Sequence, residues 1–204
     1  EDEGQAKGIE RGMEVELGPG LGDELLDAVL TNGSENIMIA ARDGRCVRFN
    51  EQDLRALGRS ASGVRGITIS DTDEVVGVIT YDPSDEHASD HTILVVSENG
   101  YGKRSDPEDY RLTARGGKGV KTLNITEKTG PVVAIKNVTE ENDLMIINHS
   151  GIAIRMSVTD IRVAGRATQG VKLINIREGD SIAAVSVVAK GEEETREQEE
   201  NINE

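Results

Sequence analysis

Residues 93–121 read ILVVSENGYGKRSDPEDYRLTARGGKGVK, and the chain holds two further copies of this segment, at residues 37–65 and 144–172. The period is 56 residues from the first copy to the second and 51 residues from the second copy to the third. Internal repeats of this length are typical of arrays in which each unit buries its apolar face against a neighbour. We therefore interpret the chain as one structural unit used three times.

The three copies share eight alignment columns. A glycine is followed by an arginine, an aspartate, two more arginines, a glycine-valine pair and a final cation, at constant spacing. In chain order the columns are Gly44/Gly100/Gly151, Arg48/Arg104/Arg155, Asp53/Asp109/Asp160, Arg55/Arg111/Arg162, Arg59/Arg115/Arg166, Gly63/Gly119/Gly170, Val64/Val120/Val171 and Arg65/Lys121/Lys172.

Each copy is predicted to consist of β-strands. The apolar runs are too short for helices, and aromatic residues are only 2% of the chain, so Val, Ile and Leu must build the interior. The runs end in the turn pairs Asp43-Gly44, Asn99-Gly100 and Ser150-Gly151, which favour tight hairpins. A third strand is expected after the glycine of the Gly63 column, and a fourth opens the next unit. About four strands per roughly 50 residues predict an all-β, propeller-like array of four-stranded blades.

The predicted organisation is three full repeats with partial ones at both ends. The repeats span residues 23–69, 73–125 and 130–190, the last including a closing strand. Residues 1–22 are expected to hold the tail end of a preceding blade and a linker. Residues 191–204 contain seven Glu and one Arg, a composition that predicts a disordered acidic tail.

Composition excludes several classes of protein. The net charge of −15 argues against a globally basic DNA-binding protein, so a DNA-binding surface must be a local basic face. No run approaches the roughly 20 apolar residues of a membrane span, so no membrane partner is expected. The chain has a single cysteine, Cys46, so an internal disulfide is excluded, and this fits a reducing cytoplasm. We interpret Cys46 as a small side chain that fills space in the core.

Catalytic chemistry finds no support in the sequence. The chain has no Walker A motif, no nucleophile elbow and no HExxH motif. His87 and His91 have a metal-ligand spacing, but they lie in a polar loop, and we expect no metal there. The chain itself is therefore expected to be non-catalytic and to bind no metal or cofactor.

The pattern Arg-x-x-x-Gly-x-[Arg/Lys] is the strongest functional signal. Small residues between cations allow a backbone to approach a phosphate closely while its N–H groups donate to it. Repetition would place one such loop at the same edge of each blade, giving the arc of cations that a curved duplex needs. The best candidates for phosphate contacts are Arg59, Arg65, Arg115, Lys118, Lys121, Arg166 and Lys172, with Lys103 and Arg104 second. The alternative is a solvated loop with a structural glycine.

Two other columns have structural explanations. The arginines of the Arg48 column are predicted to form salt bridges within a blade, with phosphate contact as the alternative. The aspartates of the Asp53 column are expected either to cap a short turn or to pair with a neighbouring arginine.

Four sequence runs resemble those of the C-terminal domain of DNA gyrase A. They are Gly63–Ile67, Asn99–Arg104, Arg115–Gly119 and Gly165–Val171, and the resemblance covers about residues 23–190. It implies a β-pinwheel, a ring of blades in which neighbours share strands, with a perimeter that binds and wraps DNA to support negative supercoiling. The nearest match to that family's heptapeptide Gln-Arg-Arg-Gly-Gly-[Lys/Arg]-Gly, which usually lies in the first blade, is Thr113–Gly119. The chain is therefore expected to hold the last blades.

The resemblance also implies partners. These are duplex DNA, the remainder of the gyrase A polypeptide, and gyrase B in an A2B2 complex of the bacterial cytoplasm. ATP and Mg2+ would be bound by gyrase B and by other domains of the complex. Two alternatives remain: the equivalent domain of topoisomerase IV, and a protein-interaction propeller, which the acidic composition favours.

Overall fold

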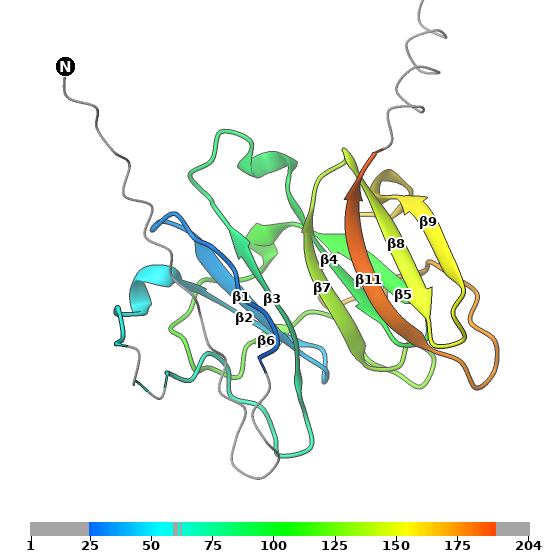
Figure 1. Cartoon of the computed structure of the whole chain (residues 1–204), viewed down its shortest axis with the longest axis horizontal. Coiled ribbons are helices and arrows are strands. Elements are labelled where there is room, and N and C mark those ends of the chain that lie inside the picture. The colour runs from blue at the N-terminus through cyan, green and yellow to red at the C-terminus, as the bar shows by residue number, and fades with distance from the viewer. Residues whose placement is uncertain (1–24, 59–60, 62, 191–204) are drawn as a thin grey trace, which may run out of the picture.

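The computed structural model describes residues 25–58, 61 and 63–190, and these residues form an all-β structure (Figure 1). The predicted end segments 1–22 and 191–204 lie outside the described residues. The strands are β1 (Asn36–Ala41), β2 (Arg45–Asn50), β3 (Val75–Tyr81), β4 (Thr92–Ser97), β5 (Tyr101–Ser105), β6 (Val120–Lys121), β7 (Val132–Val138), β8 (Asn142–Asn148), β9 (Ala153–Ser157), β10 (Val171–Lys172) and β11 (Ile182–Ala189).

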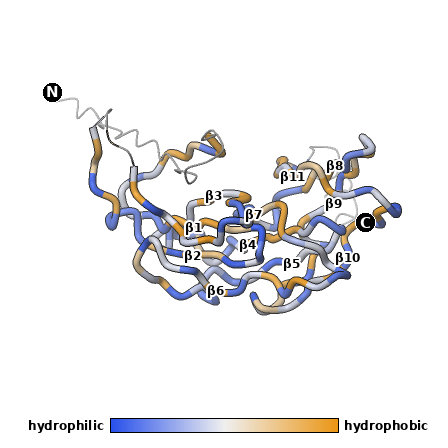
Figure 2. The backbone as a smooth tube through the Cα atoms, turned by 90° about the horizontal axis from the view of Figure 1, so that it is seen from below, coloured by the Kyte–Doolittle hydropathy of each residue, from blue (hydrophilic) through white to orange (hydrophobic). Residues whose placement is uncertain are grey.

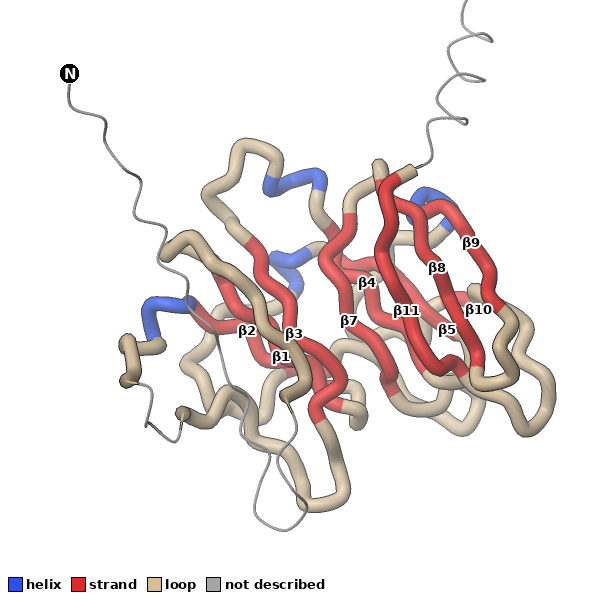
Figure 3. The backbone as a smooth tube through the Cα atoms, in the orientation of Figure 1, coloured by secondary structure: helices blue, strands red, loops and turns tan. Residues whose placement is uncertain are grey.

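Helical structure in this part of the chain is limited to short 3-10 turns between strands (Figure 3). They are η1 (Glu51–Asp53), η2 (Ala88–Asp90), η3 (Pro107–Asp109) and η4 (Val158–Asp160). None of the described helices is long and apolar enough to cross a membrane.

The strands form three antiparallel sheets that follow one another across the molecule (Figure 1). The strand order is β3-β1-β2-β6 in the first sheet, β7-β4-β5-β10 in the second and β11-β8-β9 in the third. Two sheets are therefore four-stranded, and the third has three strands within the described ranges. The predicted fold class, an all-β array of four-stranded propeller-like blades, is confirmed.

The third strand of a repeat joins the sheet of the preceding copy, which is the strand sharing that the family resemblance implies. The strand expected after Gly63 is wrong, because residues 64–69 form no strand. Strand β6 belongs to the second copy but pairs with β2 of the first, where Val120 is opposite Cys46. Strand β10 of the third copy pairs in the same way with β5 of the second. The carbonyl oxygen of Gly44 also accepts the N–H groups of Thr122 and Leu123, and that of Gly100 accepts the aligned N–H groups of the third copy. The first two hairpin turns are therefore each tied to the following copy.

The glycine columns follow from this strand sharing. Gly44 and Gly119 have φ angles of 82° and 71°, which side chains disfavour. A Cβ atom at Gly44 would lie 2.8 Å from the carbonyl oxygen of Leu123, and one at Gly119 would lie 2.5 Å from that of Cys46. These neighbours are backbone atoms and cannot move aside, so glycine is required where one copy crosses the edge of another.

The hydrophobic core lies between successive sheets. One cluster joins Met38 and Cys46 of the first sheet to Ile93 and Val95 of the second, and another joins the second sheet to the third. A third cluster covers the far face of the first sheet around Phe49. The tube coloured by hydropathy shows the apolar residues concentrated in the strands, with hydrophilic loops around them (Figure 2). Because these clusters combine residues of two successive sheets, a single copy could not bury the apolar side chains of its own strands.

Candidate nucleic-acid interface

Positive charge gathers in three aligned stretches, residues 55–65, 111–121 and 162–172, which we call the basic segments. They contain ten of the 23 lysines and arginines of the chain and none of its 38 acidic residues. The chain as a whole carries a net charge of −15, so this separation of charge is local. It meets the requirement that a DNA-binding surface on an acidic protein be a confined basic face.

The second and third basic segments each run along the outer edge of the preceding sheet. In the second, Leu112 forms a parallel bridge with Arg48 of β2, and the N–H of Thr113 donates to the carbonyl oxygen of Arg48 at 2.9 Å. The chain then turns through a loop and returns antiparallel to β2 as β6. The third segment repeats this path along β5 and returns as β10. Strands β6 and β10 lie on the same side of the molecule, away from β3 and β7 (Figure 2).

Five of the seven first-rank candidates for phosphate contact have exposed side chains. Arg59 lies outside the described residues. The side chains that are exposed are Arg65, Arg115, Lys118, Lys121 and Lys172. Arg166 is half-buried and donates hydrogen bonds to two backbone carbonyl oxygens of the second copy.

The two second-rank candidates, Lys103 and Arg104, are wrong as phosphate contacts because both are buried. Lys103 is 0% exposed and Arg104 is 4% exposed. The third copy covers their strand: the Arg104 Nε donates to the carbonyl oxygen of Ile161 at 2.8 Å. The Lys103 ammonium donates to Ser105 Oγ, and burial lowers the pKa of Lys103 to about 8, opposed by nearby Asp109. A duplex cannot reach either side chain in this fold.

The Arg48 column joins repeats instead of forming bridges within a blade. The Arg48 guanidinium donates to the carbonyl oxygens of Pro107 and Tyr110 at 2.8 and 3.1 Å and to the Glu108 carboxylate at 2.9 Å, all in the second copy. Of the three arginines, only Arg155 forms the predicted kind of salt bridge within its own sheet, with Asp143 at 2.7 Å.

The aspartates of the Asp53 column do not cap the turns. The turns η1, η3 and η4 are each capped three residues before the aspartate, where a side-chain oxygen accepts the N–H two positions on. The capping residues are Asn50, Asp106 and Ser157.

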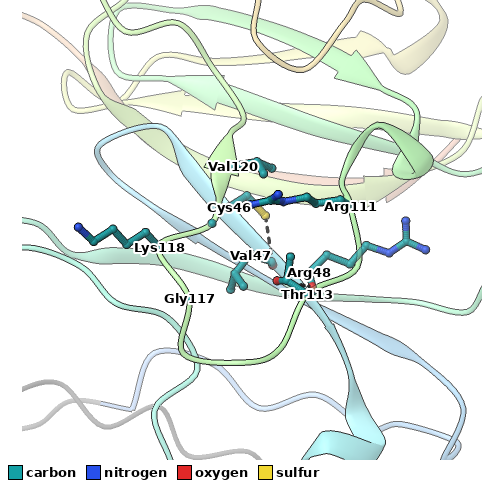
Figure 4. Close-up of a pocket in the computed structure, with 9 residues that line it drawn as sticks. Cys46, Val47, Arg48, Arg111, Thr113, Gly117, Lys118 and Val120 are labelled. Atoms are coloured by element: carbon teal, nitrogen blue, oxygen red, sulfur yellow. Dashed lines mark hydrogen bonds between the residues drawn. The ribbon is translucent and has the colours of Figure 1, made fainter.

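A pocket of about 170 Å³ lies between β2 and the loop of the second basic segment. Its lining contains three basic side chains and no acidic one, with the backbone of Gly117 and Gly119 forming part of the wall. Arg111 extends across the pocket toward Cys46, whereas Lys118 points away from it (Figure 4). Basic side chains around an exposed glycine-rich backbone can bind an anion such as a phosphate group.

Comparison with known proteins identifies the repeat. Residues 35–82, 91–139 and 142–189 match the family described as DNA gyrase C-terminal domain, beta-propeller. The chain belongs to this family. The family resemblance expected from the sequence is thereby confirmed.

Relatives of this gyrase-type domain are found in Staphylococcus aureus. The A subunit of DNA gyrase from strain NCTC 8325 / PS 47 is 48% identical over 180 residues, which are 88% of this chain and 20% of the relative. The same protein of strain MRSA252 is 47% identical over 179 residues, again 88% of this chain and 20% of the relative. The chain thus spans about a fifth of the length of these relatives.

Two solved structures have similar folds. A DNA gyrase A C-terminal domain superposes with a TM-score of 0.68 and 25% identity, covering 78% of this chain and 52% of the other. The C-terminal domain of DNA topoisomerase IV superposes with a TM-score of 0.74 and 20% identity, covering 82% and 50% respectively. The second likeness establishes the fold alone.

Sequence reasoning missed a further cation column of this gyrase-type domain, the one that contains Arg111 and Arg162. Both side chains are exposed, and no hydrogen bond or ion pair joins either to another described residue. Arg55, the member in the first copy, is also exposed. The signal was present, because the column is constant in all three copies. The pattern Arg-x-x-x-Gly-x-[Arg/Lys] does not include this column, which lies four residues before the first arginine of the pattern.

The described residues offer no obvious reactive centre. No group of three or more His, Cys, Asp or Glu residues among them could hold a metal ion. Cys46 is buried, and burial raises the pKa of its thiol well above the ordinary value, so it is a poor nucleophile. Burial also raises the pKa of Tyr110, whose hydroxyl lies 2.6 Å from Thr122 Oγ1. These groups pack the junction between repeats.

Proposed function

We propose that this chain is a non-catalytic DNA-binding and DNA-wrapping module of a type II topoisomerase of the gyrase A kind. It bends duplex DNA around the basic segments and so supports negative supercoiling. The observation that carries the proposal is the charge separation: ten cations and no acidic residue in three aligned segments of a chain with a net charge of −15.

The contacts are expected to be made to the DNA backbone. Exposed lysines and arginines neutralise phosphates and release condensed counterions, which gives affinity with little dependence on base sequence. The repetition of the segments at the outer edges of successive sheets offers cations to successive parts of a duplex. A duplex that follows such an arc is bent, and the additional contacts offset the cost of its deformation.

In the proposed assembly, chemistry belongs to other parts of the enzyme. The remainder of the gyrase A polypeptide would cleave and rejoin DNA, and gyrase B in an A2B2 complex would bind ATP and Mg2+. This chain would supply neither a catalytic residue nor a cofactor site, and its setting would be the bacterial cytoplasm. Its contribution would be the path of the bound DNA.

Two alternatives keep specific support. The first is the equivalent domain of topoisomerase IV, whose fold this chain shares and in which we expect weaker wrapping. The net charge of −15 favours a protein-interaction propeller. The latter would not bind DNA at any salt concentration and would need no cations in its edge loops.

The decisive measurement is duplex affinity at several salt concentrations for the 204-residue chain and for the Arg115→Ala/Lys118→Ala/Lys121→Ala variant. The wild-type affinity should fall steeply with salt, and the variant should lose up to about three units of the slope, about one for each phosphate contact removed. The control, Lys128→Ala/Lys136→Ala/Arg177→Ala, removes the same charge outside the basic segments and should keep the wild-type slope. No binding at low salt would overturn the proposal in favour of a protein-interaction propeller.

A further inference from the structure

One arginine column reaches backward from each basic segment to the segment before it. The Arg115 Nη1 donates to the carbonyl oxygen of Arg65 at 3.3 Å. The Arg166 Nη1 donates to the carbonyl oxygen of Lys121 at 2.8 Å, and its Nε donates to that of Asp109 at 2.9 Å. Arg65 and Lys121 occupy the same alignment column, so the contact is repeated at both junctions that the structure describes.

In the contact that both junctions share, the acceptor is the backbone of a residue whose side chain is an exposed cation. A hydrogen bond to the carbonyl of Lys121 fixes the main chain from which the Lys121 ammonium extends. A guanidinium suits this role because its donors are held in a rigid planar fork, whereas an ammonium has no fixed direction. Arg166 is only half-exposed, in contrast to the freely exposed Lys121 and Lys172.

A second repeated contact joins the residues just after one basic segment to the loop of the next segment. The N–H of Thr68 donates to the carbonyl oxygen of Gly117 at 2.9 Å, and the N–H of Asn124 donates to that of Thr168 at 3.0 Å. Thr68 and Asn124 are aligned positions, as are Gly117 and Thr168. Successive segments are thus joined to one another through these flanking residues as well, in addition to being joined to the sheets.

We infer that Arg115 and Arg166 are positioning residues that hold successive basic segments at a fixed spacing, so that the cations of the Arg65 column meet a bent duplex at regular intervals. The inference rests on the proposed DNA-binding function and gives these two arginines a positioning role in addition to phosphate contact. They set the curvature of the DNA path, while the exposed lysines and Arg65 supply most of the counterion release.

The conservative variant Arg166→Lys separates the two roles. It keeps the positive charge but loses the planar fork that reaches two carbonyl oxygens. A phosphate contact would tolerate this change, whereas a positioning contact would not. Lys172→Gln is the matched control, because it removes an exposed cation from the same segment and breaks none of the hydrogen bonds found for the described residues.

The first test measures the spacing of the segments without DNA. Spin labels at Lys118→Cys and Gln169→Cys, which are aligned positions in adjacent segments, report the distance distribution between them. Cys46 is buried with a raised thiol pKa, so it should not take up the label in the folded chain. Arg166→Lys should broaden the distribution and Lys172→Gln should leave it narrow. An unchanged distribution in Arg166→Lys would overturn the positioning role.

The second test measures bending and salt dependence together, on a duplex of about 30 base pairs with a fluorophore at each end. Arg166→Lys should keep the wild-type salt slope but lose most of the end-to-end shortening. Lys172→Gln should lower the salt slope by about one unit and keep the shortening. Wild-type shortening in Arg166→Lys would overturn the inference.

The two experiments distinguish the possible failures. If the wild-type chain does not bind DNA, the proposed function is wrong and the link to curvature fails with it. If the chain binds and bends DNA but the Arg166→Lys spacing and bend are those of the wild type, only the positioning role is wrong. Circular dichroism of each variant at the measurement temperature shows that the folded state is being compared.

Discussion

The guanidinium of Arg48, on β2 of the first sheet, donates to the carbonyl oxygen of Tyr110 in the second repeat at 3.1 Å. The same side chain is 6% exposed and also reaches the carbonyl oxygen of Pro107. One buried arginine therefore satisfies backbone acceptors of the adjacent copy. Because these hydrogen bonds cross from one repeat to the next, the two repeats stabilise each other and do not fold as independent blades.

Arg48→Met is expected to destabilise the chain by about 2–4 kcal/mol, because the carbonyl oxygen of Tyr110 loses its guanidinium donor and that of Pro107 keeps only the Tyr110 N–H. Urea unfolding followed by circular dichroism measures the change. Arg162→Met, at an exposed arginine, should stay within about 0.5 kcal/mol of the wild type. Equal costs for the two variants would show that the inter-repeat hydrogen bonds contribute nothing.

Lys103→Met is expected to stabilise the chain near pH 7. Burial lowers the pKa of Lys103 from 10.5 to about 8, so below pH 8 the folded chain bears a buried charge that the variant lacks. The gain should be on the order of 1–3 kcal/mol. Apolar residues occupy the same alignment column in the other copies, Val47 and Ile154.

The stability gain of Lys103→Met should shrink as the pH rises. Between pH 8 and pH 10.5 the unfolded wild type keeps a proton on Lys103 that the folded chain has lost, so wild-type stability increases with pH across this window. The measurement is the difference in unfolding free energy between variant and wild type at neutral pH and near the upper end of this window. A difference that does not change with pH would contradict the lowered pKa.

Gly119→Ala should be strongly destabilising, whereas Gly117→Ala, two residues away, should not. Gly119 has a φ of 71° and its Cβ would meet Cys46, so both the backbone conformation and the strand contact suffer. We expect a loss of roughly 2–4 kcal/mol. At Gly117 the nearest atom is 3.7 Å away, and the change should stay within about 1 kcal/mol. Thermal unfolding of the two variants side by side makes the comparison.

The arginines that sequence reasoning missed should contribute to DNA binding. Arg111→Gln removes a cation that extends across the basic pocket and has no hydrogen bond or ion pair with the rest of the described chain. The slope of log affinity against log salt should fall by about one unit, with little change in unfolding temperature. A wild-type slope would show that no phosphate lies in the pocket.

Deleting residues 191–204 should tighten DNA binding. The segment carries seven Glu and one Arg, so its removal lowers the negative charge that competes with phosphate for the basic segments. The expected gain is largest at low salt and disappears as screening increases. Affinity that is unchanged at low salt would show that the tail does not compete.

The basic loops were predictable from sequence because their signal is local and repeated. The spacing of Arg115, Gly119 and Lys121 recurs in every copy, and glycine between cations has a direct physical meaning. The assignments of Lys103 and Arg104 failed for a non-local reason. Nothing within 101–105 indicates that a strand rich in polar residues will be covered by a segment of the following repeat.

The sequence by itself determined the repeat, the strands and the hairpin turns, because apolar runs and Asp-Gly or Asn-Gly pairs act over a few residues. Only the tertiary structure decided which sheet each short strand joins. The pairing of Val120 with Cys46 links two repeats and depends on the close approach that Gly119 permits. The same packing decided which cations are exposed and which are buried, because exposure is a property of the neighbouring repeat and not of the residue.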